Sequence, residues 1–274
     1  MSKKAKILSI QYNPKIGDKM TNCEFVGGCI SKSVEQNSKI DLVIMPEFFS
    51  TNIDDKSFLN FPEIEENSEV LSYFCEVAKE KNVNIICGSV VEKDKTGKLF
   101  NTSYAINRGG EIIEKYRKIH LYNYLGGSEG KKICAGDTPK VVNFDFGRVG
   151  MSICFDIRYP LLYKKLIKMG AQIIVSPSAW CHLTSISKEE KESFIKTWQA
   201  FNISRAAENL IYFISTNLVG KSYPFLNSIG NSMAVSPLGE VLFCADENES
   251  VNLCEVDLGL VEKLHKEYPI CEIE

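Results

Sequence analysis

The sequence has little of what would mark an exported, membrane-spanning or disordered protein. No apolar stretch approaches the length of a membrane-spanning helix, and the first residues lack the long apolar centre and cleavage site of a signal peptide. No proline-, glycine- or serine-rich linker and no repeat of fixed period divides the chain. With 44% hydrophobic and 24% charged residues, we expect a single globular domain over residues 1–274.

An excess of charge of one sign is also absent. The 32 basic and 35 acidic residues give a formal net charge of -3 and are spread along the whole chain. Nucleic acids and anionic membranes are bound through a concentrated basic surface, which would stand out as a stripe of lysine and arginine. We therefore expect neither nucleic acid nor a membrane as a partner.

Cysteine, in contrast, is abundant, with ten residues. Most of them stand in apolar runs, as Cys87 does in Ile-Ile-Cys-Gly, where a thiol behaves as a small buried hydrophobe. Disulfides are typical of exported proteins, and no export signal is seen. We therefore expect reduced thiols and a cytoplasmic location.

Short apolar runs rich in β-branched residues alternate with segments of helical periodicity, which predicts a layered α/β fold. A hairpin whose turn contains Gly109 and Gly110 interrupts the alternation, so the sheet is expected to be mixed. Ser68 is a plausible N-cap for one helix, and Gly170 can close another. Strands are expected at 5–11, 41–45, 83–91, 102–106, 111–116, 141–146, 149–153, 173–175 and 211–216, and helices at 23–34, from 68, at 160–169 and at 198–207.

Glu47 is the first polar residue to stand out, because it directly follows the buried strand expected at 41–45. Its carboxylate would emerge at the carboxyl end of a core strand, which is the edge where open α/β sheets place their active sites. A surface glutamate at the start of a loop is the alternative interpretation. Alone, Glu47 is weak support for a site.

Cys154 ends another apolar run and is followed at Pro160 by the start of a helix. A strand-to-helix turn at this point would expose the sulfur and the backbone N–H of Phe155, as in a nucleophile elbow. The nearby helix N-terminus and nearby cations would favour the thiolate. The alternative is one more buried cysteine among ten.

Lys118 lies in residues 116–121, where strand alternation places Tyr116, Lys118 and His120 on one face. A lysine that turns toward a site can act as a fixed positive charge where an oxyanion develops. The alternative is an ordinary exposed lysine.

These stretches together resemble the signatures of the nitrilase superfamily of carbon–nitrogen hydrolases, in order and at family-like separations. The three signatures are Pro46-Glu47, residues 116–121 (Tyr-Arg-Lys-Ile-His-Leu) and residues 150–160 (Gly-Met-Ser-Ile-Cys-Phe-Asp-Ile-Arg-Tyr-Pro). The likeness covers nearly the whole chain, because the family's downstream blocks resemble Trp198, 205–209, Asn217, 230–233 and 237–240.

The resemblance implies roles for individual residues. Glu47 would be the general base, Lys118 the transition-state stabiliser and Cys154 the nucleophile. Glu129, seven residues before Gly136, matches the position of a fourth, supporting glutamate. No metal ion and no organic cofactor would be required.

The resemblance also implies a fold and an assembly. The fold is an α-β-β-α sandwich with mixed β-sheets. Members of the superfamily pair two sandwiches through their helices, so the likeness suggests a homodimer or a higher even homo-oligomer.

The chemistry that follows is acyl transfer. Glu47 would accept the proton of Cys154, the thiolate would attack the amide carbon, and Lys118 with the Phe155 N–H would stabilise the oxyanion. After ammonia leaves, water activated by Glu47 would hydrolyse the thioester, with Glu129 holding the water or the leaving amine.

Two further residues bear on the substrate. Arg158 could bind a substrate carboxylate bidentately, and an internal salt bridge to Asp156 or another acid is the alternative. Trp180 would line the pocket, although a core position is the commoner fate of a tryptophan. Because residues 156–160 resemble omega-amidases and deaminated-glutathione amidases, a small amide that carries a carboxylate is the expected substrate.

Other interpretations stay open at this point. The same three groups would serve a carbamoylase or a nitrilase proper. A Cys-His hydrolase could use His120 as its base, and a non-catalytic binding or scaffold protein could have kept the fold. A metal site at Cys181-His182 is a weak further idea, because the paired ligand spacing of zinc sites is missing.

Overall fold

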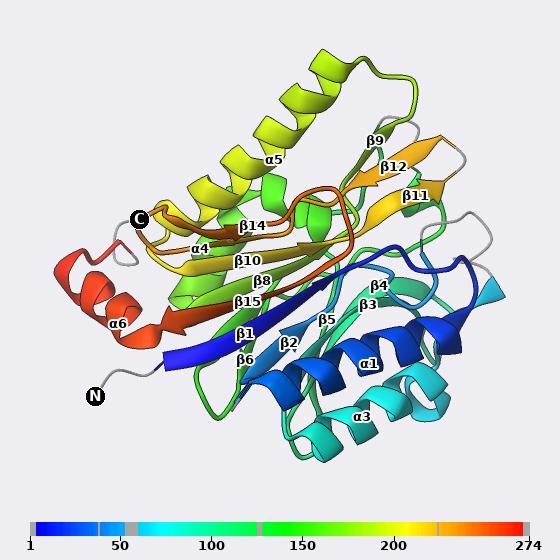
Figure 1. The fold of residues 1–274 in the computed structure, drawn as a ribbon, viewed down its shortest axis with the longest axis horizontal. Helices are drawn as coiled ribbons and strands as arrows, with labels where there is room; N and C mark the ends of the chain where they lie inside the picture. The colour runs from blue at the N-terminus through cyan, green and yellow to red at the C-terminus, as the bar shows by residue number, and fades with distance from the viewer. Residues whose placement is uncertain (1–3, 38, 53–59, 125–127, 224, 271–274) are drawn as a thin grey trace.

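The computed structural model describes residues 4–37, 39–52, 60–124, 128–223 and 225–270. Two six-stranded sheets pack face to face in the centre of the molecule (Figure 1). The first sheet has the order β15 (Ser250–Asp257), β1 (Lys4–Gln11), β2 (Leu42–Ile44), β3 (Asn84–Lys93), β4 (Leu99–Ile106) and β5 (Ile112–Arg117). The second has the order β14 (Val241–Cys244), β13 (Met233–Val235), β10 (Tyr212–Asn217), β8 (Ile173–Ser178), β7 (Arg148–Met151) and β6 (Lys140–Asn143).

Both sheets are mixed, as the sequence predicts. In the first sheet β1, β2 and β3 are parallel, and in the second β7, β8 and β10 are parallel, while the outer strands are antiparallel. A small third sheet, which the sequence analysis does not anticipate, contains β11 (Val219–Tyr223), β12 (Leu226–Ile229) and β9 (Cys181–Leu183).

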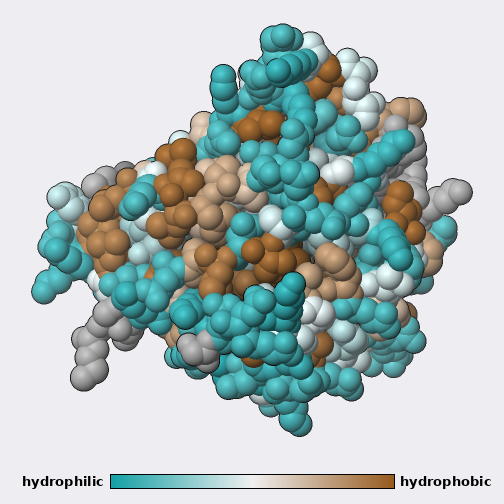
Figure 2. All heavy atoms as spheres, viewed as in Figure 1, coloured by the Kyte–Doolittle hydropathy of each residue, from teal (hydrophilic) through white to brown (hydrophobic). Residues whose placement is uncertain are grey.

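Helices cover the outer faces of the two large sheets. The first sheet is covered by α1 (Lys19–Gln36) and α3 (Glu69–Lys81), and the second by α4 (Pro160–Lys168) and α5 (Lys188–Ala207), with α6 (Leu258–Glu267) at one end (Figure 1). The predicted α-β-β-α sandwich is therefore confirmed. The surface over α1 and α3 is largely hydrophilic in Figure 2, as expected of helices whose apolar sides pack on a sheet.

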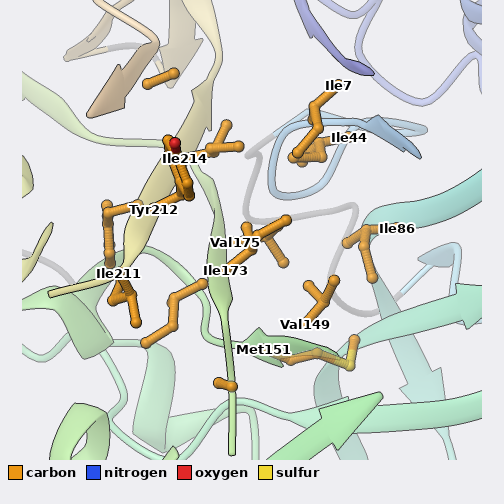
Figure 3. Packing of buried hydrophobic residues seen from close by; sticks show 14 of the residues in the cluster. Ile7, Ile44, Ile86, Val149, Met151, Ile173, Val175, Ile211, Tyr212 and Ile214 are labelled. Carbon is orange, nitrogen blue, oxygen red and sulfur yellow. The ribbon is translucent and has the colours of Figure 1, made fainter. Parts of the chain in front are cut away.

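The two faces of the first sheet contribute to different parts of the core. Ile7 packs between the sheets with Ile44, Val149 and Val175 (Figure 3), while its neighbour Leu8 packs under α1 and α3. Alternate residues of a strand point to opposite faces, so a strand buried on both faces needs apolar residues throughout. This explains the continuous apolar runs in the sequence.

Local signals in the sequence act as predicted at several element ends. The Ser68 hydroxyl accepts a hydrogen bond from the Leu71 N–H at 3.0 Å and caps α3. Gly170 has a φ of +89° after α4, and Gly110 has a φ of +82° in the hairpin between β4 and β5. Gly109 does not share this conformation, so one glycine of the pair meets the need of the turn.

The carboxyl ends of the parallel strands of the two sheets lie next to each other. The backbone N–H of Glu47, which follows β2, donates to the carbonyl of Ser178 at the end of β8, at 3.3 Å. Cys154 follows β7, the neighbour of β8. The two central strand ends thus deliver these residues to one place. None of the helices in the described ranges combines the length and the apolar character needed to cross a bilayer.

Candidate active site

Glu47 lies at the centre of a buried polar cluster, with 2% of its surface exposed. Its Oε1 accepts hydrogen bonds from Lys118 Nζ and Asn101 Nδ2, both at 2.8 Å. Its Oε2 accepts from the backbone N–H of Ala179, which follows β8, at 2.9 Å. The carboxylate is therefore held by donors from both sheets.

Lys118 directly follows β5, and its ammonium group lies between two carboxylates. Its Nζ is 2.8 Å from Glu47 Oε1 and 3.0 Å from Glu129 Oε2. The strand β5 ends at Arg117, so the alternation expected through residue 121 stops there; Lys118 nevertheless turns into the cluster, while Arg117 pairs with Glu92. The alternative of an exposed lysine is wrong.

Glu129 begins a short 3-10 helix, Glu129–Lys131, and is buried. Its Oε2 also accepts the backbone N–H of Tyr122 at 2.7 Å, and its Oε1 accepts Asn101 Nδ2 at 2.9 Å. The structure thus brings Glu129 into the same cluster as Glu47 and Lys118.

Cys154 occupies a sharp turn between β7 and the 3-10 helix Cys154–Arg158. Its φ of +45° is unusual for a residue with a side chain, as expected of a nucleophile elbow. The Glu47 carboxylate, Lys118 and the Ala179 N–H lie close enough to the thiol to affect its pKa. The residue is buried, with 7% exposure. It nevertheless lies against the polar cluster and not in a purely apolar environment.

The pKa of Cys154 depends on burial and on two charged neighbours. Burial raises the pKa of the thiol well above its ordinary value, and Glu47 raises it further, while Lys118 opposes them. Lys118 thus favours the thiolate, as expected of a nearby cation, but burial and the Glu47 carboxylate outweigh it in the resting protein. The thiol is protonated at rest and needs a base.

The same cluster supplies a basic carboxylate. Burial raises the pKa of Glu47, Lys118 opposes that shift, and the second carboxylate, Glu129, adds to it. For Lys118, burial alone would lower the pKa, but Glu129 and Glu47 raise it well above its ordinary value. The ammonium group therefore stays charged, while Glu47 keeps a higher proton affinity than an ordinary glutamate.

His120 has partners of its own. Its Nδ1 lies 2.7 Å from Asp156 Oδ1, and its ring stacks on Tyr159 with centroids 3.6 Å apart. Asp156 also accepts the Tyr116 hydroxyl at 2.8 Å and the Ile153 N–H at 2.9 Å. These contacts join the chain around Lys118 to the turn at Cys154 and give no support to His120 as the base of a Cys-His pair.

The residues expected to contact substrate lie beside Cys154. The Arg158 guanidinium is exposed and lies over the rings of Trp180, at 4.9 Å, and Phe155, at 5.7 Å. The alternative salt bridge to Asp156 is not formed, and within the described residues Arg158 has no carboxylate partner. Trp180 is buried against other aromatic rings, yet its Nε1 has no partner among the described residues.

The sequence analysis missed two donors of the cluster. Asn101 is the third residue of β4, and an asparagine between Phe100 and Tyr104 in a buried strand was the available signal. The Ala179 N–H could not have been found, because a backbone donor leaves no trace in residue identity. The idea of a metal at Cys181-His182 finds no support, since no group of three or more metal-ligand side chains occurs in the described part of the chain.

Comparison with known proteins gives a consistent result. The model of the carbon-nitrogen hydrolase family matches residues 6–266. The chain is 25% identical to omega-amidase NIT3 of Saccharomyces cerevisiae, covering 98% of this chain and 93% of that protein. It is 29% identical to human omega-amidase NIT2, covering 96% of this chain and 92% of the relative.

Solved structures show the same fold. The crystal structure of Saccharomyces cerevisiae Nit3, a member of the nitrilase superfamily, has a TM-score of 0.85 at 25% identity over 97% of this chain and 94% of that chain. A carbon-nitrogen hydrolase from Helicobacter pylori G27 has a TM-score of 0.90 at 24% identity, covering 99% and 95%. The chain therefore belongs to the carbon–nitrogen hydrolase family, within the nitrilase superfamily of enzymes.

Proposed function

We propose that this enzyme hydrolyses the amide group of a small compound that also carries a carboxylate, and that it releases ammonia through a thioester on Cys154. The observation that carries the proposal is the convergence of the Glu47 carboxylate on both the Cys154 thiol and the Lys118 ammonium in one buried cluster. The roles of the individual residues below are part of the proposal.

In the first half of the reaction Glu47 accepts the proton of the Cys154 thiol as the sulfur attacks the amide carbon. The carbonyl oxygen becomes an oxyanion, which Lys118 and the Phe155 N–H stabilise. Glu47 then passes its proton to the nitrogen, the C–N bond breaks, and ammonia leaves the thioester. The raised pKa of Glu47 suits this work, because a base is most effective when its pKa approaches the working pH.

In the second half water attacks the thioester carbon while Glu47 takes one of its protons. The C–S bond breaks, the free carboxylic acid departs, and the sulfur regains its proton from Glu47. Glu129 holds the water or the leaving amine in line through its place beside Lys118. A fixed cluster of this kind spares the reaction the cost of orienting separate groups.

The substrate carboxylate is assigned to Arg158. An exposed guanidinium beside the nucleophile without a carboxylate partner among the described residues is a ready site for one. Phe155 and Trp180 would form the adjacent wall. The omega-amidase names of the relatives support this class of substrate, while a carbamoyl compound or a nitrile is the second candidate for the same three groups.

We also propose a homodimer, or a higher even assembly, and a cytoplasmic location. The family resemblance supports the assembly. The location is supported by the nine cysteines of the described ranges, all of which are free; Cys271 lies outside those ranges.

Ammonia release from a substrate panel tests the proposal. The panel should contain ω-amides of dicarboxylates, plain short amides, carbamoyl amines and nitriles. We expect the ω-amides to have the highest kcat/KM, and Arg158→Met to raise KM for them by about 10- to 100-fold, as the loss of a charged hydrogen-bonded pair predicts. Plain amides, which have no carboxylate, serve as the control and should be hydrolysed equally by both proteins.

Preference for nitriles or carbamoyl amines would overturn the substrate assignment. Absence of turnover with every member of the panel would favour the binding or scaffold interpretation.

A further inference from the structure

Asn101 contacts three polar members of the cluster at once. It lies on β4 and is fully buried. Its Nδ2 donates to Glu47 Oε1 at 2.8 Å and to Glu129 Oε1 at 2.9 Å, and its backbone carbonyl accepts the N–H of Lys118 at 2.8 Å. One amide group therefore bridges two carboxylates that share a single ammonium.

A neutral donor suits this position better than a charged one. Two carboxylates around one ammonium repel each other, and a donor to each holds them in place. A second cation would hold them as well, but it would also lower the proton affinity of Glu47. The amide hydrogen bonds without adding charge, so it lowers the pKa of Glu47 less than Lys118 does.

The orientation of the Asn101 amide is fixed by its acceptors. If the amide were turned over, its oxygen would face two carboxylate oxygens, which offer no donor. The observed orientation leaves Oδ1 buried without a partner among the described residues. An unsatisfied buried acceptor is unfavourable, so its presence indicates that the two bonds made by Nδ2 matter more.

We propose that Asn101 is a positioning residue, which holds Glu47 and Glu129 so that Glu47 Oε2 faces the Cys154 thiol. Oε1 of Glu47 already accepts two donors, from Lys118 and Asn101, whereas Oε2 accepts the Ala179 N–H alone. Oε2 is thus the oxygen with capacity left for the thiol proton. The inference rests on the proposed role of Glu47 as the base.

The neighbouring Thr102 offers a matched control. It is equally buried, but it points to the opposite face of β4, where its hydroxyl donates to the carboxylate of Glu92 at 2.7 Å. Asn101→Leu and Thr102→Val each remove a buried donor to a glutamate from the same strand while keeping the branching of the side chain. Loss of stability is expected from both, and a change in the reaction only from the first.

The test measures how the rate of amide hydrolysis and the rate of Cys154 alkylation depend on pH. For Asn101→Leu we expect kcat to fall about 10- to 100-fold with little change in KM. The acidic limb of the kcat/KM profile should move to higher pH, because Glu47 loses a bond that favours its charged form. Lys118, Glu129, Cys154 and Cys181 are the other titratable groups near Glu47, and all are retained.

Alkylation of Cys154 by iodoacetamide, followed by peptide mapping, should show the same displacement of its acidic limb without any substrate. Thr102→Val should leave both profiles in place. Asn101→Ser, whose hydroxyl can donate to one carboxylate at a time, should fall between the wild type and Asn101→Leu, and it replaces the leucine variant if that variant does not fold.

The two possible failures can be told apart. If a folded Asn101 variant keeps the wild-type pH profile of Cys154 alkylation, Asn101 is merely structural and the inference is wrong. If the alkylation profile moves while even the wild type hydrolyses no amide, the positioning role stands and the proposed function fails.

Discussion

Glu47, which follows β2, and Glu92, on the neighbouring β3, are two buried glutamates with different surroundings. Glu92, on β3, accepts hydrogen bonds from Arg117 at 2.7 and 2.9 Å, from Lys115 at 2.9 Å and from Thr102. Burial would raise the pKa of Glu92, but the bonds from Arg117 and Lys115 outweigh it and lower the pKa below its ordinary value. This carboxylate is an anchor for the sheet and a poor base.

Glu47 is about equally buried but shares its one ammonium, Lys118, with Glu129. Its pKa is raised, whereas that of Glu92 is lowered. The difference lies in the ratio of cations to carboxylates: Arg117 and Lys115 serve Glu92 and Glu65, whereas Lys118 alone serves both Glu47 and Glu129. A buried glutamate thus has a raised pKa, and can act as a base, where fewer cations than carboxylates surround it.

The largest expected effect is the difference in kcat between variants of Glu47 and variants of Glu92. Glu47→Gln should lower kcat by about 10³-fold or more, because it removes the group that deprotonates Cys154. Glu92→Gln should leave kcat per folded molecule within about twofold, since Glu92 contacts no catalytic group. Ammonia release measures both. Comparable losses in the two variants would show that burial, and not the local charge balance, determines function.

Substitution of Lys118, beside Glu47, and of Lys115, beside Glu92, should affect kcat as differently as substitution of the two glutamates. Lys118→Met is expected to lower kcat by about 10²- to 10³-fold, because the oxyanion loses its cation. Lys115→Met removes a cation from Glu92 and should have little effect on kcat. The same assay compares them, and near-wild-type activity of Lys118→Met would remove this residue from the mechanism.

The free energy of unfolding should show the opposite order, with a larger loss in Glu92→Gln than in Glu47→Gln. Glu92→Gln is expected to cost about 2 kcal/mol of the free energy of unfolding, somewhat less than a fully buried broken pair, because Arg117 and Lys115 can turn toward water. Glu47→Gln should cost little or nothing, since the folded protein already disfavours a charge there. Urea unfolding measures both, and a larger loss in Glu47→Gln than in Glu92→Gln would contradict the assigned charge balance.

The pH dependence of these stability differences should have opposite signs. The folded pKa of Glu92 lies below its ordinary value of 4.5, so its contribution is present above that pH and is lost as the pH falls through the folded pKa. The folded pKa of Glu47 is raised, so its contribution is present at low pH and is lost as the pH rises through the folded pKa. Unfolding of wild type and both variants at several pH values checks this, and parallel curves would refute it.

Much of the fold follows from local signals. The apolar runs give the large strands, and Ser68 and Gly170 mark helix ends through chemistry that acts within a few residues. The short strands β9, β11 and β12 escape such analysis, because they form where distant parts of the chain meet.

The site shows the same limit. The positions of Glu47 and Cys154 could be predicted because each ends a core strand. The raised pKa of Cys154 could not, because burial and the charge of Glu47 are tertiary effects that outweigh the nearby Lys118. Nor could the bridge made by Asn101, whose two partners lie 54 and 28 residues away in the sequence.

The central claim is that the Cys154 thiol becomes covalently acylated during amide hydrolysis. Acid quenching of the enzyme during turnover of an ω-amide, followed by mass spectrometry of its peptides, tests it most directly. The account predicts that the peptide containing Cys154 gains the mass of the acyl group, and that Cys154→Ala abolishes both the adduct and ammonia release. Turnover without an adduct in Cys154→Ala, or an acyl group carried by another cysteine, would contradict it.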